Sequence, residues 1–555
     1  MAWIQRIVST SLAALLLCGS VTHAQTTLSV GQPLEREIAP GSSQSFGLDL
    51  DAGDYVAGML DRRGIPVSLR VLQPDGSRLR DFQGPPQGRR PFAFIAEAAG
   101  TYRFELTAPS IAEAARTGVQ LTGPGRYELT ITDKLSLDDR LKPTASEPSS
   151  PTIKALRAQI ARGEKNTEAF WRMVTEKGTP LIEPLEGNPR YTLVTFLWRG
   201  LPNTRNVAVI GTFMKEPLAE VMTRLDDTDV WYRTDTVLSG ARFVYLLSPN
   251  SPLIFDGPRA AQQMATLQAD PLNRSRWACG PEASQFECQS MVELPGAVPQ
   301  PWILRQPGRP EGKVEKYRIK SELLKNERNL SVYTPPAYRS DGPPSALVVI
   351  FDGEAYMNLV PTPVILDNLI AGSKIPPVVA ILVGNVDRNK ELPPNPDFAN
   401  FLARELIPWA HAHFNVTKDP ARTVVGGSSY GAIAAAYAGL RHPEVFGKIL
   451  CQSGSFMWAP DHVSGPDVDA STETGWLAKE YIKSPKLPLQ FHIDAGVFEV
   501  DRFASGGAIL ESSRQMRDVL LAKGYDVHYQ QFVGGHDYLG WRGTFADGLV
   551  ALIGK

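Results

Sequence analysis

Residues 423–431 read TVVGGSSYG, and residues 432–440 continue as the helix-prone stretch AIAAAYAGL. Gly427, Ser429 and Gly431 match the pattern G-x-S-x-G, placed between an apolar β-branched run and the helical segment. In this setting the glycines allow the chain to turn sharply, and the serine stands at the helix start with its Oγ exposed. A bare match is weak in a chain with 47 glycines, but the strand, turn and helix together predict that Ser429 is a nucleophile.

The region around this turn, residues 313–555, alternates apolar strand-like runs with helical segments. Runs that are apolar along their whole length are typical of parallel strands covered on both faces. They are LVVIF (347–351), VVAILV (378–383), TVVGG (423–427) and LQFHIDAG (489–496). The pattern predicts an α/β-hydrolase domain over residues 313–555, with its active site at the carboxyl ends of the strands.

A nucleophilic serine needs a base, and the base needs an orienting group. Among eight histidines we predict His536, because it follows the apolar run VHYQQFVGG, and this fold class places its histidine after the last strand. The acid is expected just after LQFHIDAG. Glu499 is the first candidate, Asp501 the second, and Asp494, still within the strand, the third. A serine–histidine pair without an acid remains an alternative.

The oxyanion hole requires backbone N–H groups directed at the developing negative charge. One is predicted from Tyr430, the residue after the nucleophile. The other is predicted from the loop after LVVIF, where Gly353 or Glu354 is the donor. The alternative is that Asp352-Gly353 forms only a turn.

Two segments precede the hydrolase region. Residues 27–134 contain short alternating runs punctuated by turn residues, which predicts a β-sandwich accessory domain. After a linker rich in Pro, Ser and Thr, residues 153–176 have helical periodicity and strand patterns follow, which predicts a second β-sandwich domain over residues 151–304. The predicted fold class is an α/β-hydrolase domain preceded by two β-sandwich domains.

Residues 1–24 have the features of a cleaved signal peptide: a basic Arg6, a short apolar core and the small-residue site Thr22-His23-Ala24. We therefore expect export to the periplasm. No integral membrane segment is expected after cleavage, because no other apolar stretch is long enough to span a bilayer. Cys279 and Cys288 lie close together in a loop-like stretch, and an oxidising compartment would allow them to pair.

Composition excludes some partners. The formal net charge is -2, with no long basic or acidic run, which argues against a nucleic-acid partner. No metal or organic cofactor is expected, because His, Cys and carboxylate residues lack ligand spacing.

The C-terminal half resembles the enterochelin (enterobactin) esterase family, within the esterase-D-like α/β-hydrolases. The matching pieces are FDGEAY at Phe351, DRNKELPPNPDF from Asp387, GGSSYGAIAA at Gly426, HPEVFGKILCQSGSFMW from His442 and GGHDYLGWRG at Gly534. The middle region resembles the N-terminal domain of the same family through GTPLIEP, VTFLWRG, LDDTDVWYRT and ADPLNRSRW. The resemblance implies hydrolysis of ester bonds in a cyclic tri-catecholate siderophore, releasing iron or recycling the ligand. It places the nucleophile on Ser429, the base on His536 and the family's glutamate on Glu499.

Other functions stay open at this point. Family members with this middle domain are cytoplasmic, whereas this chain carries an export signal, so another periplasmic ester is an alternative substrate. A feruloyl or acetyl carbohydrate esterase and a non-catalytic binding protein are the other hypotheses. A ferric catecholate is anionic, so we predict substrate-binding cations at Arg388 and Arg542. Their alternative role is pairing with carboxylates such as Glu391 or Asp547.

Overall fold

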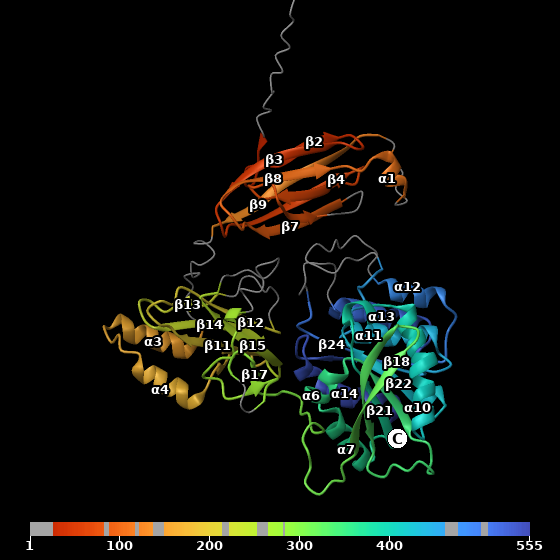
Figure 1. The fold of residues 1–555 in the computed structure, drawn as a ribbon. Helices are drawn as coiled ribbons and strands as arrows, with labels where there is room; N and C mark the ends of the chain where they lie inside the picture. Colours follow the sequence, from red (N-terminus) through yellow and green to blue (C-terminus); the bar gives the residue numbers. More distant parts are fainter. Residues whose placement is uncertain are drawn as a thin grey trace, which may run out of the picture. The chain divides into compact units, whose positions relative to one another are not determined.

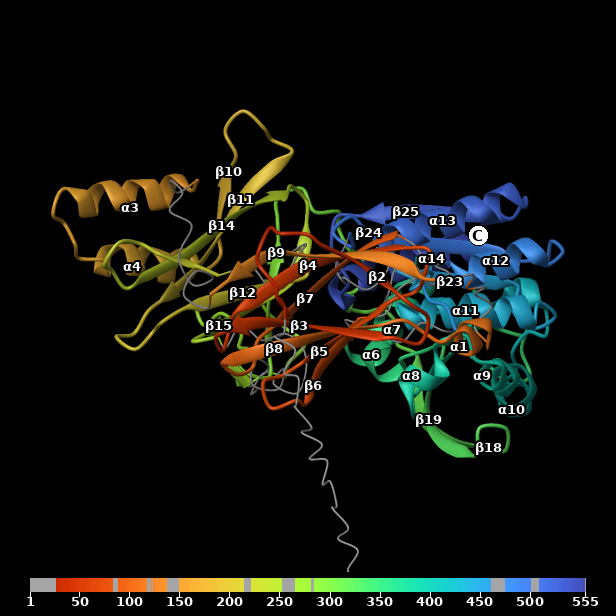
Figure 2. The same cartoon turned by 90° about the horizontal axis from the view of Figure 1, so that it is seen from above.

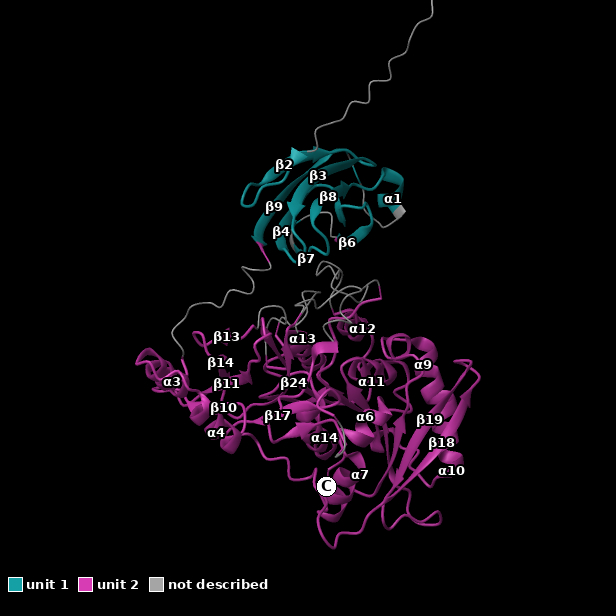
Figure 3. Cartoon of the chain, turned by 60° about the vertical axis from the view of Figure 1, so that its left-hand side comes forward, with its two compact units in different colours: residues 1–81, 86–134 teal, residues 82–85, 135–555 magenta. Residues whose placement is uncertain are grey.

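The computed structural model describes residues 26–82, 88–116, 121, 123–136, 149–213, 221–251, 265–280, 284–460, 475–500 and 509–554. The predicted signal peptide therefore lies outside the described residues. The chain forms two compact units, residues 1–81 with 86–134 and residues 82–85 with 135–555 (Figure 3).

The first unit is a β-sandwich. Its elements are β1 (Thr26–Thr27), β2 (Leu34–Ile38), β3 (Ser43–Leu50), β4 (Tyr55–Arg63), β5 (Ser68–Leu72), β6 (Arg78–Phe82), β7 (Gly88–Ile95), β8 (Gly100–Thr107), α1 (Ile111–Arg116) and β9 (Gly125–Leu135). The two sheets have the orders β1-β3-β8-β5-β6 and β2-β9-β4-β7. Aromatic rings join them: Phe94 of β7 lies 5.8 Å from Phe104 of β8 between centroids. Alternate residues of strands such as β4 and β8 thus fill one shared core.

The second unit begins with another sandwich. Its elements are α3 (Pro151–Ala161), α4 (Glu168–Lys177), β10 (Leu181–Pro184), β11 (Tyr191–Arg199), β12 (Val207–Gly211), β13 (Thr223–Arg224), β14 (Val230–Leu238), β15 (Arg242–Pro249), β16 (Arg276–Trp277) and β17 (Gln289–Glu293). The sheets are β10-β11-β14-β13 and β12-β15-β17-β16. Phe196 of β11 contacts Tyr245 of β15 across the sandwich, with ring centroids 4.8 Å apart.

Two helices cover the outer face of this second sandwich. The apolar residues of α3 and α4, such as Ile153 and Trp171, pack against Leu197 and Tyr232 of β11 and β14 (Figure 2). The periodicity of residues 153–176 indicated one helical segment, but the structure has two helices. The first ends before Gly163, whose φ of 92° suits glycine and ends the helix.

The hydrolase domain follows in the same unit. Its elements are β18 (Lys313–Ser321), β19 (Asn326–Thr334), β20 (Ala346–Ile350), α6 (Gly353–Asn358), α7 (Thr362–Ala371), β21 (Val378–Val383), α8 (Arg388–Glu391), α9 (Pro396–Phe401), the π-helical turn η1 (Leu402–Leu406), α10 (Ile407–His413), the 3₁₀ turn η2 (Pro420–Arg422), β22 (Thr423–Ser428), α11 (Tyr430–Arg441), β23 (Lys448–Gln452), α12 (Trp476–Lys483), β24 (Gln490–Gly496), α13 (Ile509–Ala522), β25 (Asp526–Phe532) and α14 (Tyr538–Ile553). Its sheet has the order β18-β19-β21-β20-β22-β23-β24-β25.

The topology of this sheet determines where a site can form. The six strands from β21 to β25 in this order are parallel to one another. Strand β19 pairs antiparallel with β21, and β18 pairs antiparallel with β19. The chain moves from β20 to β21 on one side and then returns to place β22 on the other side of β20. In open α/β sheets, ligands bind at the carboxyl ends of the strands where the order reverses in this way. The loops after β20 and β22 are those that carry Gly353 and Ser429.

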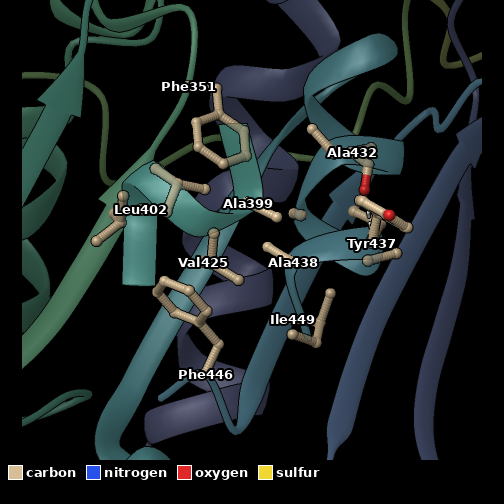
Figure 4. Packing of buried hydrophobic residues seen from close by; sticks show 14 of the residues in the cluster. Phe351, Ala399, Leu402, Val425, Ala432, Tyr437, Ala438, Phe446 and Ile449 are labelled. Atoms are coloured by element: carbon tan, nitrogen blue, oxygen red, sulfur yellow. Dashed lines mark hydrogen bonds between the residues drawn. The ribbon is translucent and has the colours of Figure 1, made fainter. Parts of the chain in front are cut away.

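Helices cover both faces of this sheet (Figure 1). Alternate strand residues face opposite sides, so Val425 and Ile449 pack with α9, α10, α11, α12 and α13, whereas Val424 and Leu450 pack with α6, α7 and α14. Figure 4 shows the first core, where Ala432 and Ala438 of α11 lie close to the strands. The predicted fold class, an α/β-hydrolase domain preceded by two β-sandwich domains, is confirmed. The individual domain boundaries stay predictions.

A buried ion pair holds the segment that follows β21. Arg328 of β19 is fully buried and donates to both carboxylate oxygens of Glu391 in α8, at 2.8 and 3.1 Å. Its guanidinium also lies over the rings of Phe398 and Phe401. Removing one member of a buried pair leaves the other charge without compensation.

Arg328→Met should therefore destabilise the hydrolase domain by about 3–5 kcal/mol in chemical unfolding. The exposed pair Arg339–Asp341 offers a matched control, and Arg339→Met should change stability by less than about 1 kcal/mol. The double variant Arg328→Met/Glu391→Leu should recover most of the loss. Equal effects of the two arginine variants would contradict this role.

Candidate active site

Ser429 occupies a strained turn between β22 and α11. Its φ of 57° and ψ of −118° lie in a region that residues with a side chain rarely adopt. Ser429 N–H donates to Gln452 O at 2.9 Å, and Ser455 N–H donates to Ser429 O at 3.2 Å. A Cβ at Gly427 would lie 3.0 Å from the Cα of Gly431, so the strand and the helix approach too closely for larger residues. The pattern G-x-S-x-G therefore has the geometry that the sequence predicted.

Glu499 and His536 form a buried acid–base pair. Glu499 Oε1 lies 2.6 Å from His536 Nδ1, and Glu499 Oε2 accepts from Gly496 N–H at 2.6 Å. The side chain of Glu499 is 1% exposed and that of His536 is 18% exposed. The carboxylate thus orients the imidazole through Nδ1, which leaves Nε2 as the nitrogen that can exchange a proton with a serine.

The loop after β23 brings nucleophile and base to one end of the sheet. His536 packs edge-to-face on Trp541 with centroids 4.8 Å apart, and Trp541 Nε1 donates to Ser453 Oγ at 2.8 Å. Two residues further along the chain, Ser455 Oγ lies 3.3 Å from Ser429 Oγ. These contacts connect Ser429 and His536 through a single short loop, and Glu499 joins them through its bond to His536. The sequence did not single out Ser453 or Ser455, because a serine beside a strand end has no distinctive pattern.

The predicted oxyanion donors begin two neighbouring helices. Tyr430 is the first residue of α11, Gly353 is the first residue of α6 and Glu354 is the second. Backbone N–H groups in a first helical turn have no acceptor within the helix, so they are available to an oxyanion. The two loops approach closely, because a Cβ added at Gly431 would lie 3.6 Å from the Asp352 carboxylate. Asp352-Gly353 is therefore the start of a helix rather than an isolated turn.

Asp494, another candidate acid, lies within a strand and away from His536. Asp494 is fully buried within β24, and its carboxylate accepts from Ser453 N–H at 3.2 Å. Asp501 lies outside the described residues. Glu499, the first candidate, is the carboxylate that the structure places against His536. The predicted cysteine pair, Cys279 and Cys288, is joined by a disulfide.

The two predicted substrate-binding arginines have different surroundings. Arg388 donates to both carboxylate oxygens of Asp352, at 2.7 and 2.9 Å, and lies over the Tyr430 ring at 5.7 Å. Burial alone would lower the pKa of Arg388, but Asp352 more than offsets this, so that pKa is raised. Arg388 thus connects the loop of Gly353 to the residue after the nucleophile.

Arg542 lies between the second sandwich and the hydrolase domain. Its Nε donates to Gln300 Oε1 at 2.7 Å, and its guanidinium lies 4.7 Å from the Trp277 ring centroid. Burial, with help from the nearby charge of Arg242, lowers the pKa of Arg542 to about 10. A substrate role for Arg542 stays a prediction, because these contacts place it in the domain interface.

The alternative role of pairing with a carboxylate holds for Arg388, through Asp352, but the carboxylates named as examples were wrong. Glu391 pairs with Arg328 instead of Arg388, and Asp547 forms no ion pair with Arg542 among the described residues. In both cases the partner is set by packing between segments that are distant in sequence.

A large open cleft of about 1100 Å³ lies beside the oxyanion loop. Its lining includes Lys316, Arg318, Glu354, Met357, Arg388 and Tyr538. Lys316 and Arg318 are exposed on β18, and burial raises the pKa of Tyr538 to about 12, so its phenol stays neutral at physiological pH. The two β18 cations were missed, because alternating charges on an edge strand are ordinary in sequence.

No three His, Cys, Asp or Glu side chains of the described ranges are grouped to hold a metal ion. Within those ranges no helix is long and apolar enough to cross a membrane. The expectation of cofactor-free hydrolysis stays a prediction.

A parallel sheet with a serine at the strained turn, and a histidine held by a glutamate, defines a serine esterase of the α/β-hydrolase class. Two family models match the chain: "Enterochelin esterase, N-terminal" over residues 193–303 and "Putative esterase" over residues 321–552. The iron(III) enterobactin esterase of Dickeya dadantii is 32% identical over 445 residues, which cover 74% of this chain and 97% of that protein. The chain belongs to the enterochelin esterase family.

Two further matches are also named as siderophore esterases. The iron(III) salmochelin esterase of Escherichia coli is 27% identical and is matched over 98% of its length, which corresponds to 72% of this chain. The enterobactin esterase of Shigella flexneri, solved in the presence of enterobactin, is 30% identical with a TM-score of 0.55. That match covers 69% of this chain and 97% of the solved chain.

The nucleophile can be tested by Ser429→Ala, which should reduce kcat on p-nitrophenyl acetate by roughly 10⁶-fold while the thermal unfolding temperature stays near wild type. His536→Ala should cost about as much, because base and nucleophile act as a unit. A Ser429→Ala protein with a tenth of the wild-type rate would exclude Ser429 as the nucleophile.

The acid is tested by Glu499→Gln, which keeps the side-chain shape but removes the charge that orients His536. We expect kcat to fall by about 10³-fold or more, as for other triad acids. Asp494→Asn, a change of the same kind in a buried carboxylate, should cost less than about tenfold, and so should Asp501→Asn. If all three variants keep near wild-type rates, the site works as a serine–histidine pair.

Proposed function

We propose that this esterase hydrolyses the ester bonds of a ferric catecholate siderophore of the enterobactin type. Family membership supports the proposal, because relatives that match over nearly their whole length are named iron(III) enterobactin and salmochelin esterases. The observation that carries it is the catalytic pair Glu499–His536 at the same sheet end as Ser429, within a chain that has both family domains.

We infer the role of each group in the reaction from its position and chemistry. Ser429 Oγ attacks the ester carbonyl carbon while His536 Nε2 takes the hydroxyl proton. The N–H groups of Tyr430 and of Gly353 or Glu354 stabilise the tetrahedral oxyanion. His536 returns the proton to the leaving alkoxide, which yields an alcohol and an acyl-serine. Water activated by His536 then cleaves the acyl-serine to a carboxylic acid and restores Ser429.

The cleft suits a large substrate. Pockets for drug-sized ligands measure about 300–1000 Å³, and this open cleft is about 1100 Å³. The Lys316 ammonium group on its rim forms no ion pair with any described residue, so it is available to an anionic ligand. A ferric tri-catecholate complex is both bulky and negatively charged, which matches these two properties.

Export to the periplasm is part of the same proposal. The signal-like residues 1–24 and the Cys279–Cys288 disulfide support it, since disulfides persist in oxidising compartments. Cell fractionation, with the mass of the mature chain, tests it: uncleaved protein in the cytoplasm would contradict it.

Purified protein incubated with apo and ferric enterobactin should release linear dihydroxybenzoyl-serine products, followed by mass spectrometry. Ser429→Ala provides the control. Lys316→Glu should raise KM for the ferric complex about five- to tenfold at low salt and leave p-nitrophenyl acetate unaffected. The difference should shrink at 1 M salt, where the screening length is about 3 Å.

Lys320→Glu reverses a charge on the same strand outside the cleft lining, and it should leave both values of KM unchanged. Hydrolysis of feruloyl or acetyl carbohydrates with no turnover of enterobactin would refute the siderophore assignment and favour a carbohydrate esterase.

A further inference from the structure

The catalytic acid and base follow the two strands at one edge of the hydrolase sheet. Strand β25 is the edge strand, and β24 is its only neighbour in the sheet among the described residues. The residues of β25 alternate between exposed and partly exposed positions, with none fully buried. Edge strands present unpaired backbone groups and are held by fewer contacts than central strands. The loops that follow β24 and β25 carry Glu499 and His536, so their placement needs support from outside the sheet.

The second sandwich supplies backbone support to both loops. Arg242 N–H, at the start of β15, donates to Val533 O at 3.1 Å. Phe498 N–H then donates to Gly534 O at 3.1 Å. Main-chain hydrogen bonds therefore join the second sandwich to the loop that carries His536, and join that loop to the one that carries Glu499.

Apolar contacts follow the same path. Phe498, which directly precedes Glu499, and Val533, which lies three residues before His536, both pack against the core of the sandwich. That core includes Phe196, Phe243 and Tyr245. The hydrolase loops thus insert side chains into the core of another domain.

Thr212, just after β12, makes the contact closest to the base. Its Oγ1 donates to Asp537 Oδ2 at 2.5 Å and accepts from Val244 N–H at 3.2 Å. Asp537 is 8% exposed and caps α14 by accepting from Gly540 N–H at 3.0 Å. A Cβ at Gly535 would lie only 1.8 Å from Thr212 O. Both chain neighbours of His536 therefore touch Thr212.

We propose that Thr212 is a positioning residue of the esterase site, through which the second sandwich holds His536 in register with Glu499. The contacts on Gly535 and Asp537 determine the path of the chain through His536, and those on Phe498 determine the path into Glu499. A displacement of a catalytic group by about 1 Å can cost up to 10²-fold in rate. This inference rests on the serine esterase chemistry of the proposed function, not on the siderophore as substrate.

The test is Thr212→Val in the full chain, with p-nitrophenyl acetate as substrate. The variant keeps the shape of the side chain but loses the hydroxyl, so kcat should fall about tenfold with KM unchanged within about twofold. Thr212→Ser restores the donor and should return kcat to within about twofold of wild type. Thr195→Val is the matched control, since Thr195 is a buried sandwich threonine whose hydroxyl bonds Thr234 at 2.9 Å within the same domain. It should leave kcat unchanged.

A positioning role also predicts non-additivity. In a Glu499→Gln background the orientation of His536 is already lost, so adding Thr212→Val should change kcat by less than about twofold. A folded Thr212→Val protein with wild-type kcat, or an equal loss in the Glu499→Gln background or in Thr195→Val, would overturn the proposal. If Thr212→Val does not fold, Val533→Ala weakens the packing of the His536 loop on the same sandwich core from the hydrolase side and should give the same results. A wild-type protein that cleaves p-nitrophenyl acetate but not enterobactin would refute the siderophore substrate alone.

Discussion

The strained backbone at Ser429 is the constraint on which the site depends. A residue in such a conformation costs about 1–3 kcal/mol and persists only when its surroundings over-determine it. Here β22 lies inside a parallel sheet, and α11 is buried from Gly431 to Gly439. The close approach of Gly427 to Gly431 fixes the angle between the strand and the helix. This packing holds Ser429 Oγ at the sheet end where the loops after β20, β23, β24 and β25 meet.

Much of this arrangement could be predicted from the sequence, because each catalytic residue follows a strand with a clear apolar pattern. The turn at Ser429, the loop before His536 and the placement of Glu499 all derive from local patterns and the strand order of the fold class. What could not be predicted are the contacts between distant segments. The paired residues Arg388 and Asp352 are 36 positions apart in the sequence, and Thr212 and Asp537 are 325 positions apart. No local pattern encodes such pairs, since they exist only when whole domains pack.

Charge is used differently inside and at the edge of the hydrolase domain. The ion pairs Arg328–Glu391 and Arg388–Asp352 have little exposed carboxylate surface, and they join loops to the sheet or to each other. Their charges are matched, so they fix geometry without a strong field. On β18 the exposed Arg318 is paired with Glu327, whereas the exposed Lys316 forms no ion pair with a described residue, so its charge reaches the solvent in the cleft. The buried pairs thus shape the site, and the exposed Lys316 ammonium group faces the substrate that enters the cleft.

The hydrogen bonds from the second sandwich to the loops of His536 and Glu499 also bear on how this protein evolves. The second sandwich and the hydrolase domain contact each other through side chains and main-chain hydrogen bonds. A recombination event that exchanged one of the two domains would therefore join surfaces that do not fit each other. They are therefore expected to be inherited as a pair. Substitutions at positions 212 and 537 should accompany one another among relatives.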